Sequence, residues 1–392
     1  MSFFKFLFLA LLMSLAGCTH PIVAENPEMY SNSGSIAPYS QETFEEYVSE
    51  TTVWLNQNRV FHGAGEGKEL DAVAPYQIIP SNPNGHGILL VHGLGDSPYS
   101  FIDIAPVLAD HGYLVRVMLL PGHGSRPADL ENPDVEDWYE SVAHQVSLLE
   151  GEVDNLWLGG FSTGTNLVTK YAAESSGITG LVLFSPAFTS KDPLVKYSSF
   201  ASRFVDWVSL EKEENYTRYD SLSMSGAALY YKTTVSVNQA LQDNTLPIPA
   251  LLLVTEQDEL IDTLDIYQTF ATLFHHPRSE LMWFGDTTID DSRVVKYPMT
   301  IPDLYIQNGS HISVLFSPEN DLYGRRGIMR QCGGSNEGEI YVIDCPRLPT
   351  LSYTAWGLFE KDAIMARLSW NPYFEPTMTR VLEFMQKTDA DL

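Results

Sequence analysis

Residues 155–171 read NLWLGGFSTGTNLVTKY, and this stretch decides the fold. The apolar residues 156–158 predict a β-strand, and the apolar residues within 167–171 have the spacing of a helix. Between the two lies Gly160-Phe161-Ser162-Thr163-Gly164, which is short enough only for a sharp turn. The stretch therefore predicts a strand, a tight turn with Ser162 at its tip, and a helix.

A serine at the tip of such a turn occupies strained backbone, so small residues are needed two positions away on either side. Gly160 and Gly164 meet that need and let the strand and the helix approach closely. The arrangement is a nucleophile elbow, which lifts the Ser162 hydroxyl above the sheet and places the N–H of Thr163 beside it. Since G-x-S-x-G also occurs by chance, a glycine-rich loop with an exposed serine is the alternative.

The composition excludes several classes of partner. The chain has 392 residues with 44% hydrophobic content, enough for one large core or a core with a sizeable insertion. Its net charge of -27 would repel nucleic acid. The same charge argues against broad electrostatic adhesion to anionic lipid.

The N-terminus predicts export and a lipid anchor. Residues 1–17 have one early lysine and an apolar run too short to span a bilayer, as a signal peptide has. They end in Leu15-Ala16-Gly17 before Cys18, which resembles the lipobox of bacterial lipoproteins. That resemblance implies a lipid on Cys18 and attachment to a membrane of the cell envelope. Thr19 replaces the aspartate of inner-membrane retention, so we expect the outer membrane, on its periplasmic or surface side; an ordinary signal peptide is the alternative.

Two further cysteines, Cys332 and Cys345, flank a glycine-rich polar segment. In an oxidising compartment two such thiols most simply form a disulfide. Metal binding is the weaker alternative, because no histidine lies near either residue in the sequence.

Apolar runs alternate with helical patterns over the middle of the chain, which predicts an α/β fold with a mostly parallel sheet covered by helices on both faces. The expected strands lie at 76–79, 88–91, 113–119, 156–161, 181–184, 250–254 and 281–284. The expected helices lie at 44–55, 99–110, 135–149, 163–174, 263–274 and 376–386. We also expect a strand at 304–306.

Three motifs at strand ends, HGLGDSP at 92–98, PGHG at 121–124 and GFSTG at 160–164, resemble the α/β-hydrolase superfamily. The resemblance is narrower to its monoacylglycerol lipase and bacterial carboxylesterase branch and covers roughly residues 76–315. It implies an α/β-hydrolase core with a cap. The apolar residues at 200, 204, 207 and 208 recur at helical spacing, and those at 224, 227, 228 and 231 do so again, so we expect the cap to be mainly helical with an apolar inner face. The expected parts are a signal peptide at 1–17, a tether at 18–41, core at 42–188 and 250–392, a cap at 189–249, and inserts near 285–303 and 317–356.

Ser162 can act as a nucleophile only if a histidine takes its proton and a carboxylate orients that histidine. In this fold the order along the chain is serine, acid, histidine. His311 matches the base of the family, whereas His275 and His276 lie at the expected end of a helix before a proline.

The resemblance selects Asp258 as the acid, just past the strand at 250–254, although a threonine stands where the family pattern has glycine. Glu256 and Asp262 are rivals. Asp262 is better placed to cap the helix that follows it.

The resemblance also assigns an oxyanion hole to the backbone N–H groups of Leu94 and Thr163, donors for a negatively charged substrate oxygen. His92 and His123 are expected to organise their loops. No residues stand at metal-ligand spacing and no phosphate-binding glycine loop is present, so the sequence implies no metal and no cofactor.

These features predict a lipid-anchored serine hydrolase that cleaves small carboxylic esters, such as monoacylglycerol or other short to medium acyl esters. Thioester or peptide hydrolysis and acyl transfer use the same residues and are alternatives. A non-catalytic surface lipoprotein that kept the fold is a further alternative, disfavoured by the retention of Ser162, Asp258 and His311.

Overall fold

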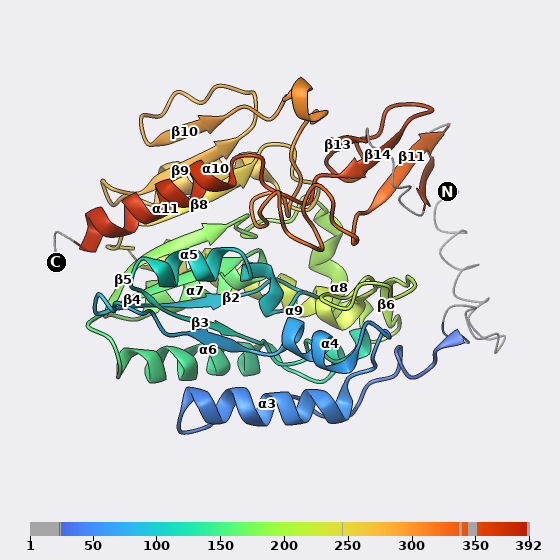
Figure 1. The fold of residues 1–392 in the computed structure, drawn as a ribbon, viewed down its shortest axis with the longest axis horizontal. Coiled ribbons are helices and arrows are strands. Elements are labelled where there is room, and N and C mark those ends of the chain that lie inside the picture. The colour runs from blue at the N-terminus through green and yellow to red at the C-terminus, as the bar shows by residue number, and fades with distance from the viewer. Residues whose placement is uncertain (1–22, 24, 245, 337–338, 344–350, 390–392) are drawn as a thin grey trace.

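A computed structural model describes residues 23, 25–244, 246–336, 339–343 and 351–389. Its centre is an eight-stranded sheet in the order β1-β3-β2-β4-β5-β8-β9-β10 (Figure 1). The strands are β1 (Tyr76–Ile78), β2 (His86–Val91), β3 (Leu114–Met118), β4 (Asn155–Phe161), β5 (Ile178–Phe184), β8 (Ala250–Thr255), β9 (Glu280–Phe284) and β10 (Val294–Tyr297). Neighbouring strands are parallel except at β1, which pairs antiparallel with β3.

Helices cover both faces of this sheet. The longer ones are α3 (Phe44–Asn58), α4 (Glu66–Val73), α5 (Ile104–Asp110), α6 (Val135–Glu150), α7 (Thr163–Glu174), α9 (Met224–Asp243), α10 (Thr263–Leu273) and α11 (Phe374–Asp389). Helices α5 and α11 pack on one face, and α6, α7, α9 and α10 on the other (Figure 1). The fold predicted from the sequence is confirmed.

Side-chain alternation within the central strands divides the core into two layers. Ile88 and Leu90 of β2 belong to the apolar cluster under α5 and α11, whereas Leu89 and Val91 belong to the cluster under α6 and α7. All four are fully buried. Central parallel strands are covered on both faces, so both sets of alternating residues must be apolar.

The segment after β9 differs from the expectation in two places. The expected insert at 285–303 contains β10, which extends the main sheet. The strand expected at 304–306 is wrong: a 3-10 turn, η4 (Pro302–Leu304), is followed by Tyr305 in a left-handed conformation with φ 57°. Pro302 fixes the backbone that starts this turn, and Ile306 keeps only isolated bridges to Ile301 and Tyr353.

The cap also differs in part from the expectation. The apolar residues near 200–208 do not share a helix, because α8 (Ser198–Ala201) ends early and β6 (Trp207–Ser209) pairs with β7 (Leu222–Ser223). Phe200 and Phe204 are mostly exposed. The second apolar set, expected at 224–231, does lie on one helix, α9, which buries Ala227 and Ala228.

The late insert is a second sheet with strand order β12-β11-β14-β13. Its strands are β11 (Cys332–Asn336), β12 (Glu339–Ile343), β13 (Ser352–Thr354) and β14 (Ile364–Arg367). Tyr353 and Ala366 join the apolar cluster under α5 and α11, so this sheet is packed onto the core. Cys332 is buried, whereas its expected partner Cys345 lies outside the described residues, as do the signal peptide and Cys18. The disulfide and the lipid anchor stay predictions.

Of the helices in the described part of the chain, none combines the length and the apolar character needed to cross a membrane.

The packing of α7 on β2 yields a prediction about stability. A Cβ on Gly164 would lie 2.0 Å from the backbone oxygen of Val91, so Gly164→Ala must displace a central strand. We expect the free energy of unfolding, measured by urea denaturation, to fall by about 3 kcal/mol. Gly151→Ala is the matched control, because its Cβ would meet nothing closer than 3.6 Å and should change stability by less than about 1 kcal/mol. Equal stabilities of the two variants would contradict this account of the turn.

Candidate active site

Ser162 stands at the sharp turn between β4 and α7. Its backbone has φ 52° and ψ -121°, a conformation that costs free energy for any residue with a side chain. The turn is closed so tightly that a Cβ on Gly160 would lie 2.6 Å from the backbone carbon of Gly164. The two glycines therefore permit the strained turn that exposes the serine hydroxyl at the carboxyl edge of the sheet.

The structure brings Ser162, His311 and Asp258 into one hydrogen-bonded chain. Nε2 of His311 lies 2.9 Å from Oγ of Ser162, and Nδ1 lies 2.6 Å from Oδ2 of Asp258. His311 and Asp258 are both buried, so the carboxylate acts on the ring through little intervening solvent. These residues come from three separate strand ends and loops, spaced far apart in the sequence.

The rival carboxylates are engaged elsewhere. Glu256 accepts hydrogen bonds from the backbone N–H groups of Asp286 and Thr287. Asp262 caps α10 by accepting from the N–H of Asp265 at 3.1 Å, as expected.

The second carboxylate oxygen of Asp258 is held by the backbone. Oδ1 accepts hydrogen bonds from the N–H groups of Leu260 at 2.8 Å and Ile261 at 3.1 Å. These bonds fix the carboxylate plane and leave Oδ2 for the imidazole of His311.

The backbone of His311 has supports that the sequence did not reveal. Its N–H donates to Oε2 of Glu259 at 3.1 Å, and its carbonyl accepts from the hydroxyl of Ser185 at 2.7 Å. Glu259 forms an ion pair with Arg367, which lies at the end of β14. The second sheet thus helps to hold the histidine, although no motif links these residues in the sequence.

The two amides expected to bind an oxyanion lie beside the nucleophile. A Cβ on Gly93, the neighbour of Leu94, would approach Cβ of Ser162 to 3.0 Å, and Thr163 is the first residue of α7. Within the described chain, neither the Leu94 nor the Thr163 N–H has a hydrogen-bond acceptor. Both donors are therefore available to a substrate oxygen.

His92 and His123 are buried behind the loops that they were expected to organise. His92 accepts the N–H of Leu120 at Nε2, at 3.0 Å, and its Nδ1 lies 2.8 Å from the carbonyl of Gly93. Burial lowers the pKa of His92 well below its usual range and lowers the pKa of His123 to about 4. Both rings are therefore neutral at physiological pH. His92 contacts the loop that carries the Leu94 amide, whereas Nδ1 of His123 lies 3.2 Å from the carbonyls of Leu120 and Pro121 in its own loop.

Asp96 lies near Ser162, and together with Arg218 of the cap it lines two small cavities, a pairing that the sequence did not predict. Oδ2 of Asp96 lies close to Gly93, 3.0 Å from where a Cβ would be. Burial raises the pKa of the Asp96 carboxyl, and the charge of Arg218 opposes that rise. Nε of Arg218 is buried without a hydrogen-bond partner. The HGLGDSP motif contains Asp96, but nothing in the sequence pairs it with a cap arginine.

Among the residues that the structure describes, no group of three or more His, Cys, Asp or Glu side chains could hold a metal ion.

Comparison with known proteins identifies relatives of part of the chain. A thermostable monoacylglycerol lipase from a Bacillus species is 33% identical over 101 residues, which cover 26% of this chain and 40% of that protein. An AB hydrolase superfamily protein from Gibberella zeae is 24% identical over 204 residues, covering 48% of this chain and 60% of that one. The matches thus span less than two thirds of either relative.

A solved structure, the monoacylglycerol lipase of Paleococcus ferrophilus, is 22% identical, with 54% of this chain and 88% of that chain covered and a TM-score of 0.44. The profile of the family described as serine aminopeptidase, S33 (Hydrolase_4) matches residues 83–282, more than half of the chain. Together with the sheet order and the elbow, this match identifies the chain as a member of the serine aminopeptidase S33 family of α/β hydrolases.

Proposed function

We propose that this protein is a lipid-anchored serine hydrolase that cleaves carboxylic esters, monoacylglycerol or other short to medium acyl esters, through an acyl-enzyme on Ser162. The observation that carries the proposal is the hydrogen-bonded chain from Ser162 through His311 to Asp258. A serine aligned with a buried imidazole and carboxylate is activated for attack on a carbonyl carbon.

In the first half of the reaction, Oγ of Ser162 bonds to the ester carbonyl carbon while Nε2 of His311 takes its proton. The carbonyl oxygen becomes an oxyanion, which the N–H groups of Leu94 and Thr163 stabilise. When the ester bond breaks, the imidazolium returns the proton to the departing alcohol. Water then attacks the acyl-serine with the same histidine as base, which releases the carboxylic acid and restores Ser162.

Two observations favour an ester over a peptide as the substrate: the name of a relative and the charges near the nucleophile. The Bacillus relative bears the name of a monoacylglycerol lipase, whereas the family description names an aminopeptidase. An aminopeptidase must bind a substrate ammonium group, yet the charge of Asp96 is offset by Arg218. Peptide hydrolysis is the second candidate because of the family description.

The cap helix α9 supports a restricted acyl site. It packs on α7, the helix that begins beside Ser162, and Asn166 of α7 donates a hydrogen bond to the hydroxyl of Thr233 of α9 at 3.0 Å. A substrate chain that enters beneath such a cover must fit a limited space, so we expect short to medium acyl groups to be preferred.

The attachment to a membrane has support from the segment that follows the expected anchor. Tyr30 donates a hydrogen bond to the carbonyl of Glu211 at 2.7 Å, and its ring makes a T-shaped contact with the ring of Trp207 of the cap. Leu194, Phe200 and Phe204 of the cap are exposed by 64% or more. A lipid on Cys18 would therefore bring an exposed apolar part of the cap close to the membrane.

Ser162→Ala tests the reaction. The variant should lose at least about 10³-fold in kcat for p-nitrophenyl butyrate, because the nucleophile is gone. Labelling by a fluorophosphonate should vanish as well, while the circular dichroism spectrum stays that of the wild type. Hydrolysis at the wild-type rate would refute the acyl-enzyme.

A matched pair of carboxylates serves as the control in the same assay. Asp258→Asn should greatly lower kcat because His311 loses its charged partner. Asp262→Asn, which removes a charge but keeps an oxygen that can cap α10, should leave kcat nearly unchanged. The opposite ranking would assign the acid to Asp262.

Acyl length is tested with a series of p-nitrophenyl esters and a matched aminoacyl p-nitroanilide. From acetate upwards, kcat/KM should rise over the first carbons, since each buried CH₂ contributes up to ~0.8 kcal/mol, and then level or fall. A preference for the anilide would favour the peptidase. A steady rise to long-chain emulsions would contradict the restricted acyl site.

Cys18→Ser tests the anchor. The wild-type protein should partition into detergent and carry an acylated N-terminal cysteine in mass spectrometry, whereas the variant should stay in the aqueous phase. Esterase activity of the variant should persist, because residue 18 takes no part in the reaction. A wild-type N-terminus without lipid would exclude this form of attachment.

A further inference from the structure

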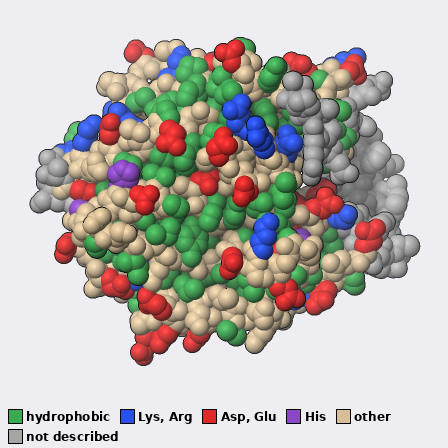
Figure 2. Space-filling view, viewed as in Figure 1, with side chains coloured by type: hydrophobic (Ala, Val, Ile, Leu, Met, Phe, Trp, Pro, Cys, Tyr) green, Lys and Arg blue, Asp and Glu red, His purple; other side chains and the backbone are tan. Residues whose placement is uncertain are grey.

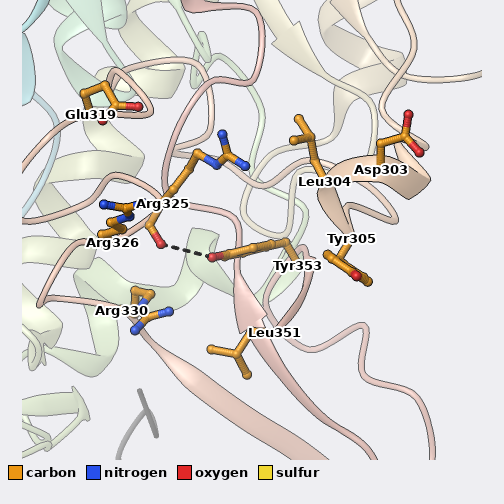
Figure 3. Close-up of a pocket in the computed structure, with 9 residues that line it drawn as sticks. All are labelled: Asp303, Leu304, Tyr305, Glu319, Arg325, Arg326, Arg330, Leu351 and Tyr353. Atoms are coloured by element: carbon orange, nitrogen blue, oxygen red, sulfur yellow. Dashed lines mark hydrogen bonds between the residues drawn. The ribbon is translucent and has the colours of Figure 1, made fainter. Parts of the chain in front are cut away.

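A cavity with a volume of about 370 Å³ lies between η4, the loop at 319–330 and β13 (Figure 3). Three arginines line it: Arg325, Arg326 and Arg330. Leu351 and Tyr353 provide buried apolar surface beside them. The cavity therefore combines clustered positive charge with a partly apolar wall.

The charge of this cavity is unlike that of the whole chain, which has 50 acidic and 23 basic residues. Figure 2 shows acidic side chains scattered over the visible face of the molecule. Several arginines elsewhere form ion pairs, such as Arg116 with Glu152 and Arg367 with Glu259. Three arginines within six residues around one cavity are therefore a local concentration of positive charge.

The guanidinium groups of this cavity have spare donors. In the described part of the protein, those of Arg326 and Arg330 have no ion-pair or hydrogen-bond partner. The guanidinium of Arg325 lies over the ring of Trp370, 5.6 Å from its centre, which leaves its N–H donors unused. Each planar guanidinium can therefore offer two parallel N–H groups to an anion.

Two carboxylates also line the cavity and restrict what it can hold. Asp303 and Glu319 are exposed, and Figure 3 shows Asp303 on the opposite side from Arg326 and Arg330. Three cations face two carboxylates, so the site attracts a compact anion that reaches the arginines. An extended polyanion would meet Asp303 and Glu319 as well.

We propose that this cavity binds a phosphate group, either free phosphate or the phosphodiester of a lipid headgroup, between Arg326, Arg330 and Arg325. The fork of a guanidinium matches the oxygens of a phosphate, and several arginines together hold its charge. The volume exceeds that of a phosphate, so an attached glycerol unit would have room beside Tyr353 and Leu351. This site is separate from the proposed esterase centre and does not depend on it.

The wall of this cavity is joined to the segment that leads to His311. The N–H of Tyr353 donates to the carbonyl of Tyr305 at 2.8 Å, and the N–H of Gln307 donates to the carbonyl of Tyr353 at 2.9 Å. A phosphate group at the arginines would therefore bind next to backbone that supports the active-site loop.

Isothermal titration calorimetry on the full-length protein in non-ionic detergent tests the site, with inorganic phosphate and sn-glycero-3-phosphoglycerol as probes. At low ionic strength, wild type should bind at least one probe, and added salt should weaken binding. Arg326→Gln/Arg330→Gln should lower the affinity at least tenfold. Arg203→Gln, which removes an exposed cap arginine, should leave it unchanged, and glycerol should not bind.

The two probes distinguish the sources of the phosphate. Tighter binding of the glycerophosphodiester assigns the site to a lipid headgroup, and tighter binding of inorganic phosphate assigns it to the free ion. Retained p-nitrophenyl butyrate hydrolysis by the double variant shows that it is folded, so a lost affinity reports on the site. Absence of binding by both probes, or equal affinity in the double variant, would overturn the proposal.

Discussion

The close approach of α7 to β2 is the constraint on which the rest of the site depends. Without side chains at 160 and 164, the helix begins directly against the carbonyl of Val91, and the backbone of Ser162 is forced to a positive φ. That turn directs the serine hydroxyl outward at the edge where the parallel strands end. A looser turn would relieve the strain and also move the serine hydroxyl away from His311.

The remaining groups are held by supports of different kinds. The carboxylate of Asp258 accepts hydrogen bonds from two backbone N–H groups just beyond β8, so residues close to it in the sequence set its orientation. His311 lies in a loop without regular secondary structure and depends on Glu259 and Ser185 from other segments. Because Glu259 is itself paired with Arg367, the second sheet contributes to the active site without touching the nucleophile.

The charge at individual sites differs from the strongly negative net charge of the chain. Near the nucleophile, Asp96 and Arg218 offset one another in a setting where burial alone would favour a protonated carboxyl. At the second sheet, Arg326 and Arg330 have no such partner among the described residues and leave a positively charged cavity. The net charge of -27 therefore does not predict the charge at each individual site of the protein.

The sequence by itself determined the elbow, the strands of the main sheet as far as β9 and a short list of acids and bases, because these follow from local spacing and from the chain order of the superfamily; it did not reveal β10. The resemblance selected Asp258 over Glu256 and Asp262, and the tertiary structure added the contacts that separate the three: Asp258 meets His311, whereas the other two bind backbone N–H groups. It also placed Phe204 and Trp207 outside a common helix, because strand pairing with 222–223 outweighs helical spacing. The support of His311 by Arg367 was beyond sequence reasoning for the same physical reason: contacts between distant segments are set by packing, which leaves no periodic pattern in the chain.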